Sequence, residues 1–204
     1  MGYVGTVESE WKIFVISDAY RWNLVVTLAM VIHYFVLVQI AGAPRKKLFN
    51  KDWMEENFGE EHKQALNGAS IGAGGYPDHG SGRYTMKLGY KGWMEFNKAQ
   101  RIHYNYLESI SQILCMMIIS GLYFPIATAC IGGVYLFARI WFQLGYMLIG
   151  PKGRMYAVPF VMLTQFLFPI FTIVSLSYLA GNACNTLSDA SAKAKEMAKL
   201  EEAE

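Results

Sequence analysis

Four stretches of the chain are mainly apolar and are long enough to cross a bilayer as helices. A membrane-spanning helix needs about 20 mainly apolar residues. Such stretches lie at about 22–43, 96–122, 126–149 and 156–180. No residue from 109 to 138 is charged, and because this run is longer than one span needs, we expect a tight turn where Gly121 and Pro125 interrupt it. The pattern predicts an all-α membrane protein, a four-transmembrane-helix bundle.

The segments around these spans divide the chain into three parts. Residues 1–21 are short and amphipathic, and we expect an interfacial segment before the membrane domain at 22–185. Residues 186–204 are rich in Ala, Lys and Glu, which predicts a solvated helix or a docking element. The loop 44–95 is too long for a simple connection. Its mixed-charge part, 51–66, predicts a short surface helix, and its Gly-rich part lacks the Gly-Lys-Ser/Thr of a phosphate-binding loop.

The composition agrees with a membrane protein. The 204 residues are 53% hydrophobic, with a mean hydropathy of +0.21, which is too apolar for an ordinary soluble domain. A net charge of +2 is too small to favour nucleic acid as a partner. Most Lys and Arg residues lie between 45 and 101 or in the turn 150–154, so the positive-inside rule predicts that these face the cytosol and that both termini face the other side. We expect the endoplasmic reticulum membrane, with a mitochondrial membrane as the alternative.

Three cysteines, Cys115, Cys130 and Cys184, lie in apolar surroundings. None belongs to a Cys-x-x-Cys motif or has a histidine at the spacing of a metal ligand. We therefore expect them to be buried as small apolar residues, and we predict no metal site.

A polar face opens the second span. Arg101, Asn105 and Glu108 follow one another at i, i+4 and i+7, so they share one side of a helix. Ionisable groups in a membrane are costly and usually face a bundle interior or a polar cavity. Two interpretations remain open for this face: a ligand-binding wall, or a polar network that only holds helices together.

A second stripe lies in the third span. Tyr135, Arg139, Phe142 and Tyr146 recur at i, i+4, i+7 and i+11. Arg139 is a full charge in the middle of an apolar helix, so we expect an acidic partner for it. Glu108 is the candidate for that partner.

Taken together, these motifs resemble a known family, the membrane-associated proteins in eicosanoid and glutathione metabolism (MAPEG), and especially the microsomal glutathione S-transferases of the third type. The second span carries Phe96-Asn97-x-x-Gln100-Arg101-x-His103-x-Asn105-x-Leu107-Glu108. The third span carries Val134-Tyr135-Leu136-Phe137-Ala138-Arg139 followed by Gly145-Tyr146, and the first ends in Ala43-Pro44-Arg45-Lys46-Lys47. The resemblance covers most of 22–180.

The resemblance implies a homotrimer in the lipid bilayer, with glutathione bound as co-substrate at each subunit interface near the cytosolic leaflet. It implies that Arg154 activates the thiol of glutathione. The positions that it assigns to glutathione binding are Arg45, Lys46, Arg101, His103, Asn105, Glu108, Arg139 and Tyr146.

The resemblance further implies a glutathione transferase or peroxidase, which conjugates glutathione to lipophilic electrophiles or reduces lipid hydroperoxides. Phe142 and Ser109 depart from the pattern of active members, because each stands where an aromatic hydroxyl is expected. An alternative therefore stays open: a weak or inactive member that acts as a lipid-binding scaffold or as an accessory subunit of a larger membrane complex, such as a respiratory one.

Overall fold

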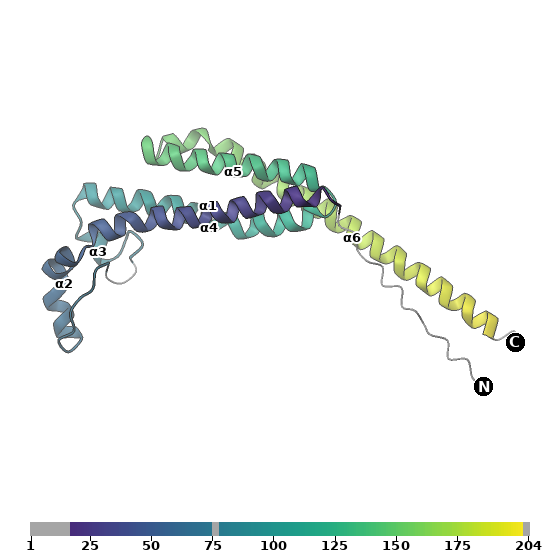
Figure 1. The fold of residues 1–204 in the computed structure, drawn as a ribbon, viewed down its shortest axis with the longest axis horizontal. Coiled ribbons are helices and arrows are strands. Elements are labelled where there is room, and N and C mark those ends of the chain that lie inside the picture. The colour runs from purple at the N-terminus through teal and green to yellow at the C-terminus, as the bar shows by residue number, and fades with distance from the viewer. Residues whose placement is uncertain (1–16, 75–77, 202–204) are drawn as a thin grey trace.

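The computed structural model describes residues 17–74 and 78–201, and all regular structure in these ranges is helical. The helices are α1 (Tyr20–Leu48), α2 (Lys51–Ala65), α3 (Arg83–Met86), α4 (Tyr90–Gly121), α5 (Pro125–Leu148), the 3₁₀ helix η1 (Gly153–Tyr156) and α6 (Val158–Glu201). The long helices α1, α4, α5 and α6 pack side by side as a bundle (Figure 1), in which α1 contacts α4 and α5, and α6 contacts the same two helices.

Helix ends differ from the expected ones. The first apolar stretch lies inside α1, but α1 does not end at Pro44 and continues to Leu48. Arg45, Lys46 and Lys47 form its last turn, where positive charge is favourable beside the exposed carbonyl groups. The long connection contains α2, where a surface helix is expected, and α6 runs into the C-terminal tail without a break.

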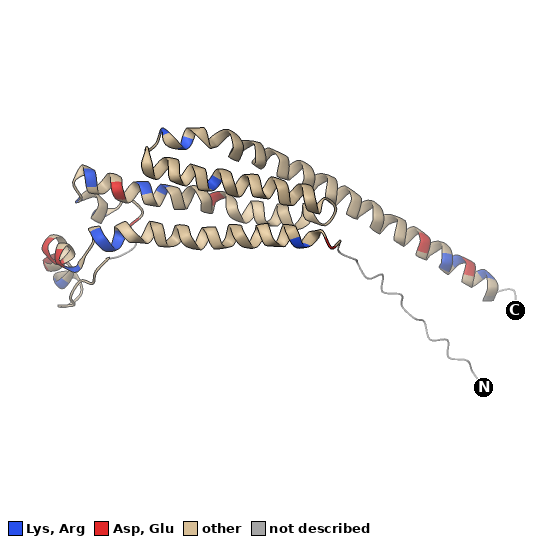
Figure 2. Ribbon diagram, turned by 45° about the horizontal axis from the view of Figure 1, so that its top comes forward, with Lys and Arg blue, Asp and Glu red and all other residues tan. Residues whose placement is uncertain are grey.

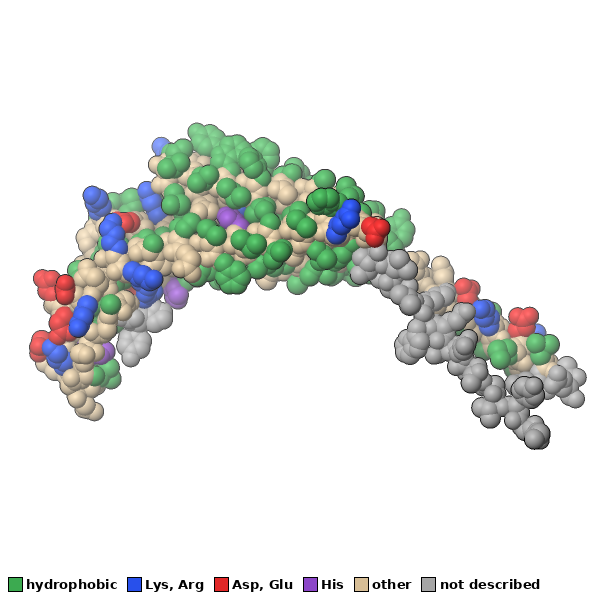
Figure 3. All heavy atoms as spheres, viewed as in Figure 1, with side chains coloured by type: hydrophobic (Ala, Val, Ile, Leu, Met, Phe, Trp, Pro, Cys, Tyr) green, Lys and Arg blue, Asp and Glu red, His purple; other side chains and the backbone are tan. Residues whose placement is uncertain are grey.

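Three of the described helices, α1, α5 and α6, are long and apolar enough to cross a membrane. Their outward sides carry large exposed apolar residues, such as Phe35 on α1 and Phe166 on α6, which are 63% and 68% exposed, and Figure 3 shows such side chains along the bundle. Apolar surface of this extent requires lipid around it. The protein is therefore an integral membrane protein. Helix α4 is as long as its neighbours, but polar residues fill its first half.

The cysteines are not buried. Cys115, Cys130 and Cys184 are free and exposed on the surfaces of α4, α5 and α6. The expectation of burial is wrong for a physical reason: in a membrane protein, an apolar segment has an outward face that lipid covers, so an apolar neighbourhood in the sequence does not imply the core.

The start of α1 is packed against the end of α4 and hydrogen-bonded to it. The side chain of Asn23 is fully buried and donates a hydrogen bond to the Met117 carbonyl at 2.8 Å. Gly121 makes room for it, because a Cβ atom at this position would lie 2.3 Å from Nδ2 of Asn23. This contact and the apolar core behind it fix the register between the two helices.

A second apolar cluster holds the long connection to the bundle. Phe49, Met54, Phe58, Ile71 and Phe96 are buried together, and the ring of Phe49 lies between α2 and α4, in contact with Trp53 of α2 and Phe96 of α4. The connection is therefore an ordered cap on one end of the bundle in the part that the structure describes.

The Asp78 carboxylate organises the last part of this connection. It accepts hydrogen bonds from the backbone N–H groups of Gly80, Gly82 and Thr85, each at 2.9 Å, and from the Thr85 hydroxyl at 3.0 Å. Burial acts to raise the pKa of Asp78, but these hydrogen bonds outweigh it and hold the pKa below its usual value.

Candidate functional site

A cavity of about 500 Å³ opens between α4, α5, η1 and α6. This volume lies within the range of small-molecule sites. Polar side chains on its wall come from all four elements: Asn105, Glu108, Arg139, Arg154 and Gln165. The cavity therefore unites most of the polar face of α4 with the charged residue of α5 and the basic turn that follows it.

Arg139 is the most deeply placed charge on this wall. Its side chain is only 5% exposed, and its Nη1 atom donates a hydrogen bond to Oδ1 of Asn105 at 2.7 Å, while Nη2 donates to the hydroxyl of Ser109. The guanidinium also lies over the rings of Tyr106 and Tyr135, at 5.4 and 5.0 Å from their centroids. Charge-assisted hydrogen bonds and cation–π contacts partly offset the cost of burying this cation.

Glu108 is not the partner of Arg139, and this expectation is wrong. No ion pair joins the two among the described residues, and Glu108 is exposed at the cavity wall. Residues 105 and 108 share a broad face of α4 but point in different directions around the helix axis. Of the two, Asn105 is the one that contacts Arg139 on α5. Nε of Arg139 is buried without a hydrogen-bond partner. A buried cation without an acidic partner favours an anionic ligand beside it.

Arg154 reaches the same cavity from η1. Its guanidinium lies over the ring of Tyr146, at 5.6 Å from the centroid. Two glycines bring η1 this close to α5: a Cβ atom at Gly145 would lie 2.5 Å from the carbonyl oxygen of Gly153, and one at Gly153 would lie 2.1 Å from that of Gly145. The placement of Arg154 therefore depends on a backbone contact that only glycines permit.

Arg101 lies in a smaller cavity of about 340 Å³, which the capping connection covers. Glu108 lines both cavities, so the two are neighbours on the face of α4. His79 and Tyr104 are hydrogen-bonded to each other on the wall of the smaller one. Its roof is fixed by Trp93, whose indole N–H donates to the Gly80 carbonyl at 3.2 Å.

Three residues that the resemblance assigns to the site lie elsewhere in this chain. Arg45 and Lys46 line neither cavity, and Nη2 of Arg45 donates a hydrogen bond to the Gly74 carbonyl at 3.1 Å. His103 packs its ring against Tyr34, with centroids 5.5 Å apart. One copy of the chain thus brings together only part of the predicted set. Tyr146 contacts the site through Arg154.

The structure adds polar contacts and cavity-lining residues that the sequence did not predict. Ser109 contacts the Tyr135 hydroxyl at 2.8 Å besides accepting from Arg139, and Gln112 and Gln165 line the cavity. A signal for Gln112 was present, because it continues the polar face of α4 at i+7 from Asn105.

The MAPEG family model matches residues 22–174. The chain belongs to the MAPEG family. The predicted family is thereby confirmed, while its assignment to the third type of microsomal glutathione S-transferase stays a prediction. No curated protein matches the chain. Family membership fits a membrane protein of glutathione or eicosanoid metabolism. Most of the basic residues of this MAPEG protein lie at the end of the bundle that carries α2 and η1 (Figure 2).

Proposed function

We propose that this MAPEG protein binds glutathione in the cavity between α4, α5, η1 and α6. The observation that carries the proposal is the buried charge of Arg139, which faces the cavity without an acidic partner among the described residues. Glutathione carries two carboxylates and one ammonium group. Arg139 suits a carboxylate, Glu108 suits the ammonium, and Asn105 suits the peptide amides.

We propose that the thiol of glutathione reacts with a second, lipophilic substrate and that Arg154 is the catalytic residue. A guanidinium beside the thiol stabilises the thiolate and so lowers the pKa of the sulfur from about 8.5. The thiolate forms a carbon–sulfur bond with a lipophilic electrophile, whose leaving group departs with the bonding electrons. In the peroxidase variant, two glutathione molecules reduce a lipid hydroperoxide to the alcohol and water and become the disulfide.

We further propose a four-span topology and a homotrimer in which a neighbouring copy completes each site. The support is that Arg45, Lys46 and His103 line neither cavity of their own chain, although the resemblance assigns all three to glutathione binding. A cyclic assembly can bring such residues to the cavity of the next copy.

The test is binding and turnover by the purified protein in detergent. Wild-type protein is expected to bind glutathione in calorimetry and to conjugate a chlorinated aromatic or reduce a fatty-acid hydroperoxide. Arg154→Ala is expected to lower turnover at least about tenfold with little change in glutathione affinity. Lys152→Ala, in the same turn, is the matched control and should behave as wild type. Absence of both binding and turnover in the wild type would refute the proposal.

A second candidate rests on the C-terminal part of α6. From residue 181 to residue 200 this helix is exposed along its whole described length, and it projects beyond the bundle (Figure 1). Such an extension favours the alternative of an accessory subunit that docks on a larger membrane complex. Stoichiometric partner subunits that co-purify with the full chain, and are lost when residues 186–204 are removed, would support this candidate over the enzyme.

A further inference from the structure

A third cavity lies outside the proposed glutathione site. It is a groove of about 560 Å³ between the end of α1, the first turns of α4 and the end of α5. Apolar side chains form its floor, among them Ile40, Met94, Ile102 and Met147. None of its lining residues lines the cavity of Arg139 and Arg154.

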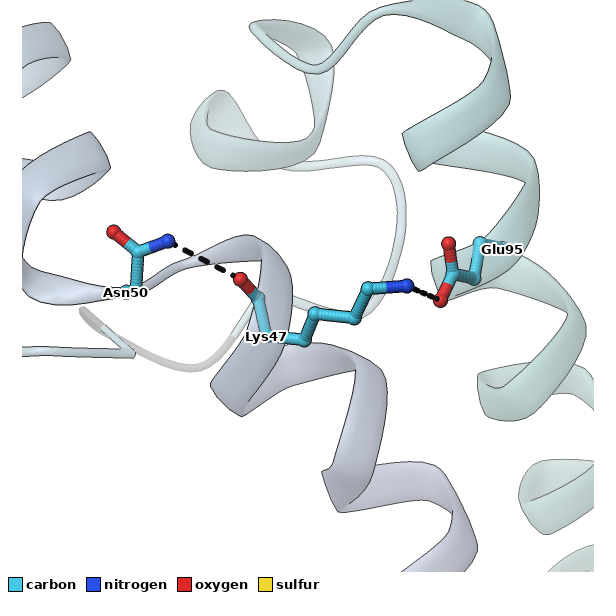
Figure 4. Close-up of polar contacts among 3 residues, drawn as sticks. All are labelled: Lys47, Asn50 and Glu95. Atoms are coloured by element: carbon cyan, nitrogen blue, oxygen red, sulfur yellow. Dashed lines mark hydrogen bonds and ion pairs between the residues drawn. The ribbon is translucent and has the colours of Figure 1, made fainter.

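Charged side chains occupy the rim of the groove. Lys91, Glu95 and Lys98 follow one another at i, i+4 and i+7 on α4, so they stand on one side of the helix. Glu95 is already paired, because its carboxylate accepts a hydrogen bond from the Lys47 ammonium at 2.8 Å (Figure 4). No ion pair of Lys91 or Lys98 occurs among the described residues. The rim is thus net positive and selects an anion.

The position of the groove points to the membrane surface. Its α1 wall lies where the apolar span passes into Arg45, Lys46 and Lys47. On its α5 side Met147 is 46% exposed and the neighbouring Leu148 is 82% exposed. Apolar floor, lipid-facing surface and basic rim therefore meet at the height where lipid headgroups lie.

We propose that this groove binds an anionic phospholipid, with an acyl chain on the apolar floor and the headgroup phosphate at Lys91 and Lys98. Basic pockets between transmembrane helices recognise anionic headgroups in this way. The two lysines are about 10 Å apart along the helix axis, which suits a diester phosphate and its substituent better than a single carboxylate. Lys98 lines the groove, and its Nζ lies near the turn after α5, 3.8 Å from where a Cβ atom at Gly150 would be.

The test is native mass spectrometry of the delipidated full chain, titrated with phosphatidylglycerol or with phosphatidylcholine of the same acyl chains. Each lysine near a headgroup is expected to contribute about fivefold in affinity. Wild-type protein should therefore prefer phosphatidylglycerol by roughly 25-fold. The double variant Lys91→Gln/Lys98→Gln should lose most of that preference.

Two further variants make the result specific. Lys51→Gln/Lys87→Gln removes the same charge outside the groove and should keep the wild-type preference. Ala43→Trp fills the exposed side of the groove and should weaken binding of both lipids. The proposal is overturned if the groove variant keeps its preference, if the control pair loses it equally, or if oleate binds where phosphatidylglycerol does not. None of these outcomes bears on glutathione binding.

Discussion

At the scale of the residue, Arg139 matters because its neighbours are neutral. Asn105 and Ser109 satisfy its two terminal nitrogens, and two tyrosine rings cover its faces. Neither contact neutralises the charge. An arginine of this kind is tolerable without a ligand and becomes more favourable when a carboxylate arrives.

This arrangement predicts the effect of Arg139→Gln. Losing one partner of a buried charge pair costs about 2–5 kcal/mol, so glutathione affinity should fall at least about 30-fold, as measured by calorimetry. Helicity by circular dichroism should persist, because Gln still offers a donor to Asn105. The control is Arg21→Gln, an exposed arginine at the start of α1. Unchanged glutathione affinity in Arg139→Gln would place the ligand elsewhere.

Sequence reasoning identified the residues at this scale but not their partners. The helical spacing predicted that Asn105 and Arg139 belong to polar stripes, and both line the cavity. It assigned Glu108 to Arg139, because spacing gives the face of a helix and not the direction in which its neighbour lies. Ser109 was noted only as a missing hydroxyl, whereas in the structure it contacts Arg139.

At the scale of the element, the decisive contact is the one between η1 and α5. The backbones touch at Gly145 and Gly153, and the short helix then directs Arg154 across Tyr146. The apolar pattern predicted α5 well, but it carries no information on a glycine-to-glycine contact, which depends on three-dimensional approach.

Gly145→Ala should therefore impair the site without breaking α5. The added methyl group would push η1 away, at about 1–3 kcal/mol of overpacking, and Arg154 would move with it. We expect turnover to fall more than tenfold in the conjugation assay. Gly133→Ala on the same helix meets nothing within 4 Å and should leave turnover unchanged. Equal activity in the two variants would contradict the role of this contact.

The capping connection should loosen in acid through Asp78. Because hydrogen bonds lower the pKa of Asp78 in the folded chain, its contribution to stability is complete above the unfolded pKa of about 3.9 and is lost as pH falls through the folded pKa. The protection of the Gly80, Gly82 and Thr85 amides against hydrogen exchange, taken relative to the intrinsic exchange rate at each pH, should therefore fall below about pH 4. Asp78→Asn should show fast exchange already at neutral pH, whereas Asp189→Asn in the exposed tail should not. Protection that persists to pH 2 would contradict this role.

At the scale of the whole molecule, one chain divides the predicted glutathione-binding residues between separate places. Arg139 and Arg154 line one cavity and Arg101 another, while Arg45 and Lys46 line neither. The long apolar segments predicted an all-helical membrane protein correctly, because hydropathy reflects which residues are buried or contact lipid. Hydropathy does not predict whether or how copies of the chain associate, since an oligomer interface in a membrane is about as apolar as the lipid-facing surface.

A complementation experiment tests the shared site directly. Arg45→Ala and Arg154→Ala should each lower turnover at least about tenfold on their own, because each would remove one half of every site. If the halves come from different copies, co-expression in equal amounts should restore turnover to about a quarter of the wild type, since that share of interfaces would pair two intact halves. If both residues served the cavity of their own chain, every site in the mixture would lack one of them and no turnover would return. If Arg45→Ala alone keeps full activity, α1 of a neighbouring copy contributes no residue needed for the reaction through Arg45.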